Sequence, residues 1–139
     1  MEKEIQRKYM QYQLVQQQLK NLIEQKVALD EKKNEVTESL DAVKKIEKLE
    51  KNNAMWSSLG SGVFISSNIN STDKFLVSIG ANVAIKKNTE DAVRILEERL
   101  SEIEELDDHI ISEINKYGEQ MQKSEQELQK LVEASESKK

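Results

Sequence analysis

The sequence contains no proline and no cysteine, and it has few glycines. Three of the four glycines, Gly60, Gly62 and Gly80, lie in the middle of the chain, so only Gly118 interrupts the flanking segments. Long uninterrupted helices are therefore expected on both sides. The absence of cysteine excludes disulfides, thiol catalysis and cysteine-ligated metal.

Apolar and aromatic residues are also scarce. Charged residues make up 34% of the 139 residues and aromatic residues 4%, which is poor material for a globular core. The first residues, MEKEIQRKYMQ, lack an apolar h-region, and no run approaches the roughly 18 apolar residues of a membrane span. We therefore expect neither an export signal nor a membrane helix, and a cytoplasmic location.

The net charge of −5 is unevenly distributed along the chain. Residues 1–50 carry ten basic and ten acidic side chains, residues 51–89 carry four and one, and residues 90–139 carry seven and fifteen. A nucleic-acid-binding surface needs a basic stripe, so the acidic last segment argues against nucleic acid as a partner.

Residues 57–87 are the only stretch where the apolar pattern departs from the helical period. Short β-branched and aromatic runs are separated there by Gly60-Ser61-Gly62 and by Gly80-Ala81-Asn82, which tolerate positive φ in tight turns. The pattern predicts two β-hairpins in series. Four short strands cannot cover their own edges, so we expect an oligomerisation surface. Its predicted residues are Val63, Phe64, Ile65, Phe75, Val77, Ile79, Val83 and Ile85.

The two flanking segments have the spacing of coiled-coil helices. Their apolar residues recur at alternating steps of three and four, over about 1–50 and about 89–134. Asn88, three residues before Asp91, has the position of a helix N-cap. The fold class that follows is mainly α with a small β insert: an antiparallel two-helix coiled-coil hairpin with two β-hairpins between the helices. We expect one domain over residues 1–139, ending in a disordered tail at 135–139.

Polar residues interrupt both predicted seams. Lys26 and Lys33 occupy a positions of the first helix and are expected to weaken the seam and fix its register, while Asp107 and Ser124 interrupt the second. At the end remote from the hairpins, fraying of the seam is expected to expose apolar and methionine side chains. The residues predicted to bind client proteins there are Ile5, Tyr9, Met10, Tyr12, Met121, Leu128 and Leu131.

No pattern in the sequence indicates catalysis, a cofactor or a metal site. The acidic pairs 97–98 and 104–105 fall on exposed helix positions, whereas general acid–base chemistry needs a pocket. His109 is the only histidine and falls off the seam, so we do not expect it to bind metal. Trp56, the only tryptophan, has two interpretations, a packing plug where the first helix meets the strands or a direct contact with a partner.

The middle of the chain resembles the α-class subunits of the prefoldin family, most closely the archaeal form. The resemblance lies in Leu59-Gly60-Ser61-Gly62-Val63, in Val77-Ser78-Ile79-Gly80-Ala81 and in the capped start Asn88-Thr89-Glu90-Asp91-Ala92-Val93. Two hairpins are typical of the α class and one of the β class. Family members often carry proline before the Leu-Gly pair, where this chain has Ser58, so that turn is expected to be less rigid.

The resemblance implies a chaperone assembly. It implies a hexamer of two α and four β subunits in which the strands form a double β-barrel platform and six coiled coils project from it. Unfolded proteins are then held at the coiled-coil tips without ATP and passed to a group II chaperonin.

Two other functions remain compatible with the residues. The chain could form a structural homo-oligomer or filament that spaces other proteins. It could also be a tRNA-binding helical hairpin of the synthetase-arm type, although that function needs a basic face.

Overall fold

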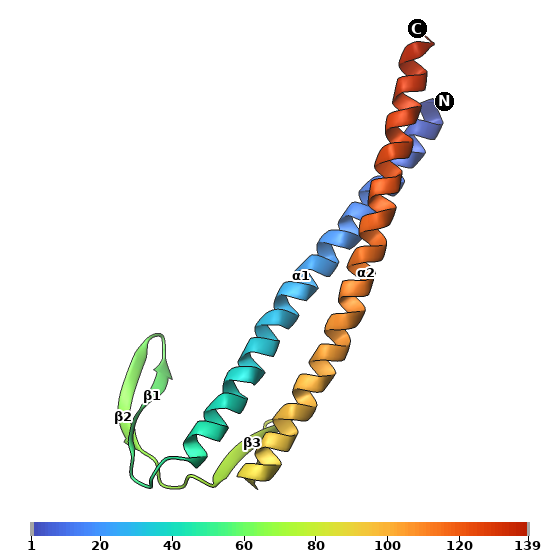
Figure 1. Ribbon diagram of the computed structural model, residues 1–139. Helices are drawn as coiled ribbons and strands as arrows, with labels where there is room; N and C mark the ends of the chain where they lie inside the picture. The colour runs from blue at the N-terminus through green and yellow to red at the C-terminus, as the bar shows by residue number, and fades with distance from the viewer. Residues whose placement is uncertain (1, 139) are drawn as a thin grey trace. The chain divides into compact units, whose positions relative to one another are not determined.

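The computed structural model describes residues 2–138, which form two long helices with four strands between them. The order is α1 (Glu2–Glu47), β1 (Ala54–Gly60), β2 (Val63–Asn68), β3 (Lys74–Gly80), β4 (Val83–Asn88) and α2 (Thr89–Ser137) (Figure 1). Both helices lack proline, and acidic residues in their first turns favour the positive end of the helix dipole. The predicted fold class is confirmed.

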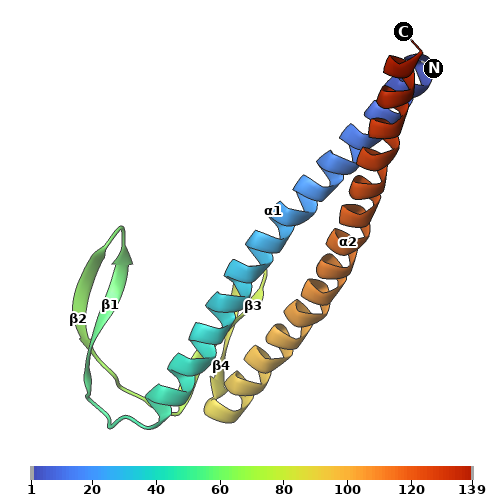
Figure 2. The same ribbon diagram turned by 45° about the horizontal axis from the view of Figure 1, so that its top comes forward.

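The described residues form two compact units. The terminal unit consists of residues 2–32 and 103–138, and the strand unit consists of residues 33–102. In the terminal unit the two helical segments lie side by side in both views (Figures 1 and 2). They run antiparallel, because Lys8 contacts Glu127 whereas the later Lys26 contacts the earlier Asp107.

The strand unit contains two separate antiparallel hairpins, β1–β2 and β3–β4. Both have two-residue turns, Ser61-Gly62 and Ala81-Asn82, in which every φ is positive. That geometry matches the twist of the flanking strands, so the predicted turns are confirmed. The buried core of this unit consists of Val36, Leu40, Ile69 and Ala92.

The two hairpins are an internal repeat with an offset of 20 residues. Ala54 pairs with Asn68 and Lys74 with Asn88, and each hairpin has a register irregularity at the same place, Ser58/Gly60 and Ser78/Gly80. Five of the fifteen offset positions hold the same residue, at 58/78, 60/80, 63/83, 65/85 and 68/88. The same strand framework therefore occurs twice, with different side chains on it.

The start of α2 is fixed by the predicted cap. The Asn88 side-chain oxygen accepts a hydrogen bond from the Asp91 backbone N–H at 2.8 Å. The Asp91 carboxylate does not complete the reciprocal bond; instead it contacts Arg94 at 2.9 Å, one turn further along. Asn88 therefore satisfies one of the free N–H groups of the first turn, as expected of an N-cap.

Several element boundaries differ from those predicted. α1 ends at Glu47 and not near residue 50, because Lys48 and Leu49 form tighter backbone bonds to Lys45 and Ile46. The strands begin at Ala54 and not at 57, so Trp56 belongs to β1. α2 continues to Ser137, where the Ser137 hydroxyl donates to the Ala134 carbonyl at 3.1 Å. Residues 135–137 of the predicted disordered tail are therefore helical, and Lys139 lies outside the described residues.

Within residues 2–138, neither helix has a segment that is both apolar and long enough to cross a membrane.

Candidate functional surfaces

The β1–β2 hairpin presents apolar side chains that its own chain leaves exposed. Trp56 is 70% exposed and Phe64 57%, and Leu59, Val63 and Ile65 are also exposed. Trp56 lies directly opposite Ser66, and Phe64 opposite Ser58, so strand alternation places both aromatic rings on one face. The interpretation of Trp56 as a packing plug is wrong, because that role requires a buried ring.

The β3–β4 hairpin is partly anchored to the helices of the strand unit. Phe75 and Val77 are half-buried and line a hollow of about 200 Å³ together with Val43, Ala92 and Leu96. The Arg99 side chain donates a hydrogen bond to the Ser78 backbone carbonyl. Leu76, on the opposite face, is 70% exposed. One face of this hairpin is thus held by its own chain and the other is free to meet a partner.

The predicted oligomerisation residues are divided between these environments. Six of them are exposed, Val63, Phe64, Ile65, Ile79, Val83 and Ile85, whereas Phe75 and Val77 pack toward the helices. Trp56, Leu59 and Leu76 are equally exposed and were not among the predicted residues. Leu76 can be identified from the sequence, because it breaks the alternation of apolar and polar residues along β3.

A second exposed apolar surface lies near the start of α1, in the terminal unit. Tyr9, Met10 and Leu14 are 52%, 64% and 67% exposed. Met10 and Leu14 are four residues apart, so they are neighbours on the helix surface, and Tyr9 lies beside them. These three residues are called the α1 patch. Leu14 was not predicted, although its spacing from Met10 was a usable signal.

The other predicted client-binding residues lie in the seam of the terminal unit. Ile5, Tyr12, Met121, Leu128 and Leu131 are half-buried rather than exposed. Beside them, a groove of about 400 Å³ lies between the two helices, lined by residues that include Leu14, Val15, Gln120 and Ser124. The small side chain of Ser124 at a seam position leaves this part of the interface loosely filled.

Two polar contacts join the helices near this groove, whose lining includes Glu127. The Lys8 ammonium and the Glu127 carboxylate are 2.6 Å apart, and the Tyr12 hydroxyl donates to the Glu125 carboxylate at 2.9 Å. The hydrogen bond and positive charge of Lys8 lower the pKa of Glu127. The hydrogen bond to Glu125 raises the pKa of the Tyr12 hydroxyl.

These shifts predict that this end of the seam opens in acid. Because the pKa of Glu127 is lowered in the folded chain, its stabilisation is present above the ordinary glutamate pKa and is lost as pH falls through the lowered value. The effect is modest, because both side chains are more than a third exposed to solvent. Spin labels at Gln6→Cys and Gln129→Cys will report a broader distance distribution in acid than at neutral pH. In the same labelled chain, Glu127→Gln is expected to broaden the distance distribution already at neutral pH and to reduce its further change in acid. If the variant broadens in acid as much as the labelled wild type, the Lys8–Glu127 contact is not what opens.

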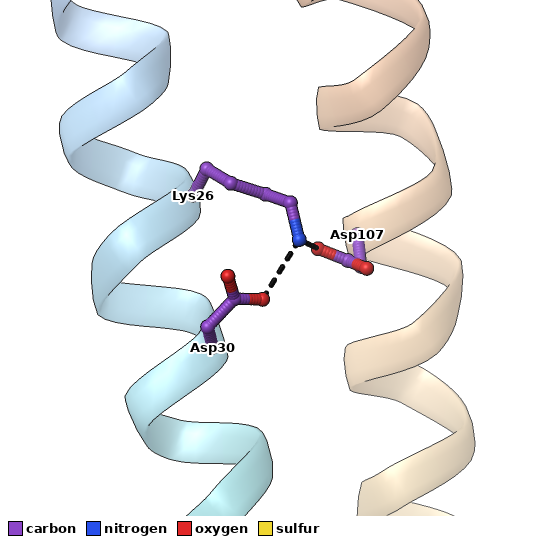
Figure 3. Close-up of polar contacts among 3 residues, drawn as sticks. All are labelled: Lys26, Asp30 and Asp107. Carbon is purple, nitrogen blue, oxygen red and sulfur yellow. Dashed lines mark hydrogen bonds and ion pairs between the residues drawn. The ribbon is translucent and has the colours of Figure 1, made fainter.

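A third polar contact lies deeper in the seam of the terminal unit. Lys26 reaches from α1 toward Asp107 on α2, and Asp30 lies one turn further along α1 (Figure 3). The Lys26 ammonium is 2.7 Å from an oxygen of each carboxylate. The Asp107 side chain is only 13% exposed. The contacts with Asp107 and Asp30 raise the pKa of Lys26, so its ammonium is charged at neutral pH.

This contact explains two of the seam interruptions seen in the sequence. Lys26 and Asp107 each replace an apolar residue on their own helix, and the structure pairs them with each other. Their charges are compensated in this register, which agrees with the expectation that a polar residue at an a position specifies alignment.

Among residues 2–138, no group of three or more histidine or acidic side chains is arranged to hold a metal ion. His109 is exposed on α2. The features that stand out are therefore apolar surfaces and the polar contacts between helices.

Comparison with known proteins agrees with this organisation. The family described as "Prefoldin subunit" matches residues 15–134. A prefoldin subunit alpha from Archaeoglobus fulgidus is 28% identical over 127 residues, which cover 91% of this chain and 93% of that protein.

Solved structures show the same fold. Filamentous PFD from Methanocaldococcus jannaschii, determined by cryo-EM, has a TM-score of 0.71 at 18% identity and covers 81% of this chain and 93% of its own. The prefoldin beta subunit from Thermococcus strain KS-1 has a TM-score of 0.62 at 19% identity, and the match covers 92% of this chain and 91% of that subunit. Because the family match extends over most of the sequence, this chain belongs to the prefoldin family, as its strand segments and the capped start of α2 predicted.

Proposed function

We propose that this chain is a subunit of an ATP-independent holdase chaperone of the cytoplasm, which binds unfolded proteins and passes them to a group II chaperonin. Membership of the prefoldin family supports the role of chaperone subunit. The observation that carries the holdase mechanism is the α1 patch, where Tyr9, Met10 and Leu14 are more than half exposed. A contiguous exposed apolar surface is typical of a binding site.

The chemistry of this surface suits clients of many sequences. The flexible thioether of Met10 adapts to different shapes, and Tyr9 offers an aromatic ring with a polar tip. The half-buried seam residues Ile5, Tyr12, Met121, Leu128 and Leu131 enlarge the apolar area when the end of the seam opens. No nucleotide and no catalytic group takes part in this binding.

Assembly is assigned to the strands. The exposed apolar residues of β1–β2 and β3–β4 would be covered by neighbouring subunits, and the family resemblance implies β subunits in an α2β4 hexamer. A strand edge offers unpaired N–H and C=O groups to an adjoining chain. We propose these contacts for the exposed residues Val63, Phe64, Ile65, Ile79, Val83 and Ile85. The predicted residues Phe75 and Val77 would support them from the face that packs toward the helices.

Suppression of client aggregation tests the proposal. The chain is mixed with a prefoldin beta subunit, and light scattering of a chemically denatured client is followed after dilution, without ATP. A stoichiometric amount of the assembled protein is expected to slow aggregation strongly. Aggregation at the uninhibited rate would contradict the holdase function, provided that sedimentation shows that the two subunits have assembled.

A structural filament is a second candidate, favoured by the fold shared with the filamentous PFD of Methanocaldococcus jannaschii. Electron microscopy of the isolated chain tests it. Filaments that leave client aggregation unchanged would favour this function over the holdase.

A further inference from the structure

The helix α2 carries a row of lysines that its overall charge conceals. Residues 90–139 contain seven basic and fifteen acidic side chains, yet three of the lysines recur at intervals of seven, at Lys116, Lys123 and Lys130. Seven residues are almost two turns of an α-helix, so these side chains lie on one face of α2, about 10 Å apart. All three are exposed. They are called the lysine row.

The lysine row lies on the same side of the terminal unit as the groove between the helices. Lys123 lines that groove together with Leu14 of α1. Arg7 precedes Leu14 by seven residues and is exposed, so it lies on the groove side of α1. Basic side chains of both helices therefore border one groove.

The lysine row is not paired with carboxylates of its own chain. Glu127 is an acidic residue of the groove lining, and it is paired with Lys8 at 2.6 Å. Among residues 2–138, none of the three lysines forms an ion pair, although Glu113, Glu119 and Glu133 lie within one turn of them. The row is thus available to the carboxylates of a bound segment.

The groove itself offers apolar and uncharged side chains. Leu14 is 67% exposed, and Val15 beside it is half-buried. The rest of the lining includes the uncharged residues Gln11, Gln120 and Ser124. A segment that places apolar side chains in this groove brings the residues next to them within reach of the lysine row.

The spacing of the lysine row fits an unfolded segment. Unfolded chains often adopt the polyproline II conformation, which has three residues per turn and a rise of about 3.1 Å per residue. Every third side chain then lies on one side, roughly 9 Å from the next. Carboxylates at every third residue can therefore meet successive lysines, whereas basic side chains at the same places would be repelled.

We propose that the groove bordered by the lysine row and Arg7 binds client segments in which acidic residues separate apolar ones, and discriminates against basic segments. This inference rests on the proposed holdase function. It adds the charge of the client segments that the chain selects.

Two peptides of equal length test the inference, one made of Glu-Leu-Ser repeats and the other of Lys-Leu-Ser repeats. Fluorescence anisotropy measures the affinity of each labelled peptide for the full chain. An exposed ion pair strengthens an interaction about twofold, so three lysines should favour the acidic peptide by roughly tenfold. Because salt screens exposed charges, this preference should shrink at high salt.

Variants assign the preference to the lysine row. Lys116→Gln/Lys123→Gln/Lys130→Gln should reduce it to within about twofold. The matched single variants are Lys123→Gln and Lys20→Gln. Both lysines are exposed in the terminal unit, but Lys20 is six residues beyond Leu14 and lies on a different face of α1. Lys123→Gln should lower the preference about twofold, and Lys20→Gln should leave it unchanged. Circular dichroism verifies that each variant is folded.

Three results would overturn the inference. They are a wild-type chain that binds the two peptides equally or not at all, a preference that survives loss of the lysine row, and displacement of the acidic peptide by a single-stranded RNA oligonucleotide, which would indicate a general polyanion surface. Aggregation suppression by the chain assembled with a beta subunit is measured separately. Suppression without a charge preference refutes this inference alone, whereas absence of suppression contradicts the holdase function.

Discussion

Replacing Lys26 with leucine is expected to lower the melting temperature by roughly 4 to 8 °C, a shift typical of a clear loss of stability in a small domain. The variant leaves the Asp107 carboxylate without its 2.7 Å partner at a position where the side chain is 13% exposed. An uncompensated charge in a buried position is strongly destabilising. Asp107→Leu should cost less, because Lys26 keeps its contact with Asp30. Thermal unfolding by circular dichroism measures both.

The double variant Lys26→Leu/Asp107→Leu is expected to melt at or above the wild-type temperature. Two leucines can pack in the seam, and replacing a buried ion pair with apolar residues is often neutral or stabilising. What the double variant loses is alignment. If one helix slid by a heptad, Lys26 would face Ile114 or Leu100 instead of Asp107. A buried charge that faces an apolar residue is costly, so both shifted alignments are disfavoured in the wild type. The double variant lacks this charge and therefore lacks this penalty.

Alignment can be measured directly because the chain has no cysteine. Spin labels at Gln11→Cys and Gln120→Cys, which line the same groove, should give one distance peak in the wild type. The double variant should add peaks displaced by up to about 10 Å, the rise of one heptad. A single unchanged peak in the double variant, together with an undiminished melting temperature for Lys26→Leu, would contradict a register role.

Serine substitution of the α1 patch is the second large effect that we expect. Tyr9→Ser/Met10→Ser/Leu14→Ser removes three exposed apolar side chains and should lower client affinity by roughly tenfold or more, because buried aromatic and aliphatic anchors dominate binding. All three are more than half exposed, so their replacement should disturb the seam little, although Leu14 also lines the groove between the helices. Client binding is measured with a fluorescently labelled, permanently unfolded protein.

The matched control is Ile23→Ser/Val27→Ser on the same helix. These residues are 48% and 55% exposed in the same unit but lie further from the end of the seam. Affinity should stay within about twofold of wild type. Equal losses in the two variants would mean that clients bind along the whole of α1 and not at the α1 patch. Sedimentation confirms that each variant still assembles with its beta subunit.

The elements of this fold follow from local sequence rules. Heptad spacing without proline accounts for both helices, glycine and asparagine at positive φ account for both turns, and Asn88 accounts for the start of α2. Each of these signals depends on residues that are close in sequence. Boundaries were less accurate, since the end of α1 depends on a few backbone bonds near Lys48.

Features that depend on distant residues could not be predicted in the same way. Ile69 lies in a polar loop yet is buried, because its backbone bonds to Asn52 and Asn53 hold it against the strand unit. Lys26 and Asp107 each looked like a defect of its own helix, and only their contact in space shows that they compensate each other. The sequence leaves two interpretations of Trp56 open, a packing plug and a contact with a partner, and only its 70% exposure in the folded chain separates them.

The functional surfaces were predicted in kind but not in detail. The apolar strand residues and the residues Tyr9 and Met10 were identified from pattern and position. Ile5, Tyr12, Met121, Leu128 and Leu131 were predicted as seam residues that bind clients when the seam opens, and their half-burial agrees with the seam position. Seam position alone does not separate residues that only pack from residues that also bind. The exposed fraction of each side chain in the folded chain makes that distinction, and it adds Leu14 to the candidate client-binding residues.

The central claim is that the strands in the middle of the chain form the subunit contacts, whereas the two ends of the chain bind clients. Cross-linking of a bound client tests this claim most directly. The chain assembled with its beta subunit is mixed with an unfolded protein carrying a photoreactive group, irradiated, and analysed by mass spectrometry. Cross-links within residues 5–14 and 121–131, with residues 54–88 unmodified, are the predicted result. Cross-links concentrated in residues 54–88 would contradict the account.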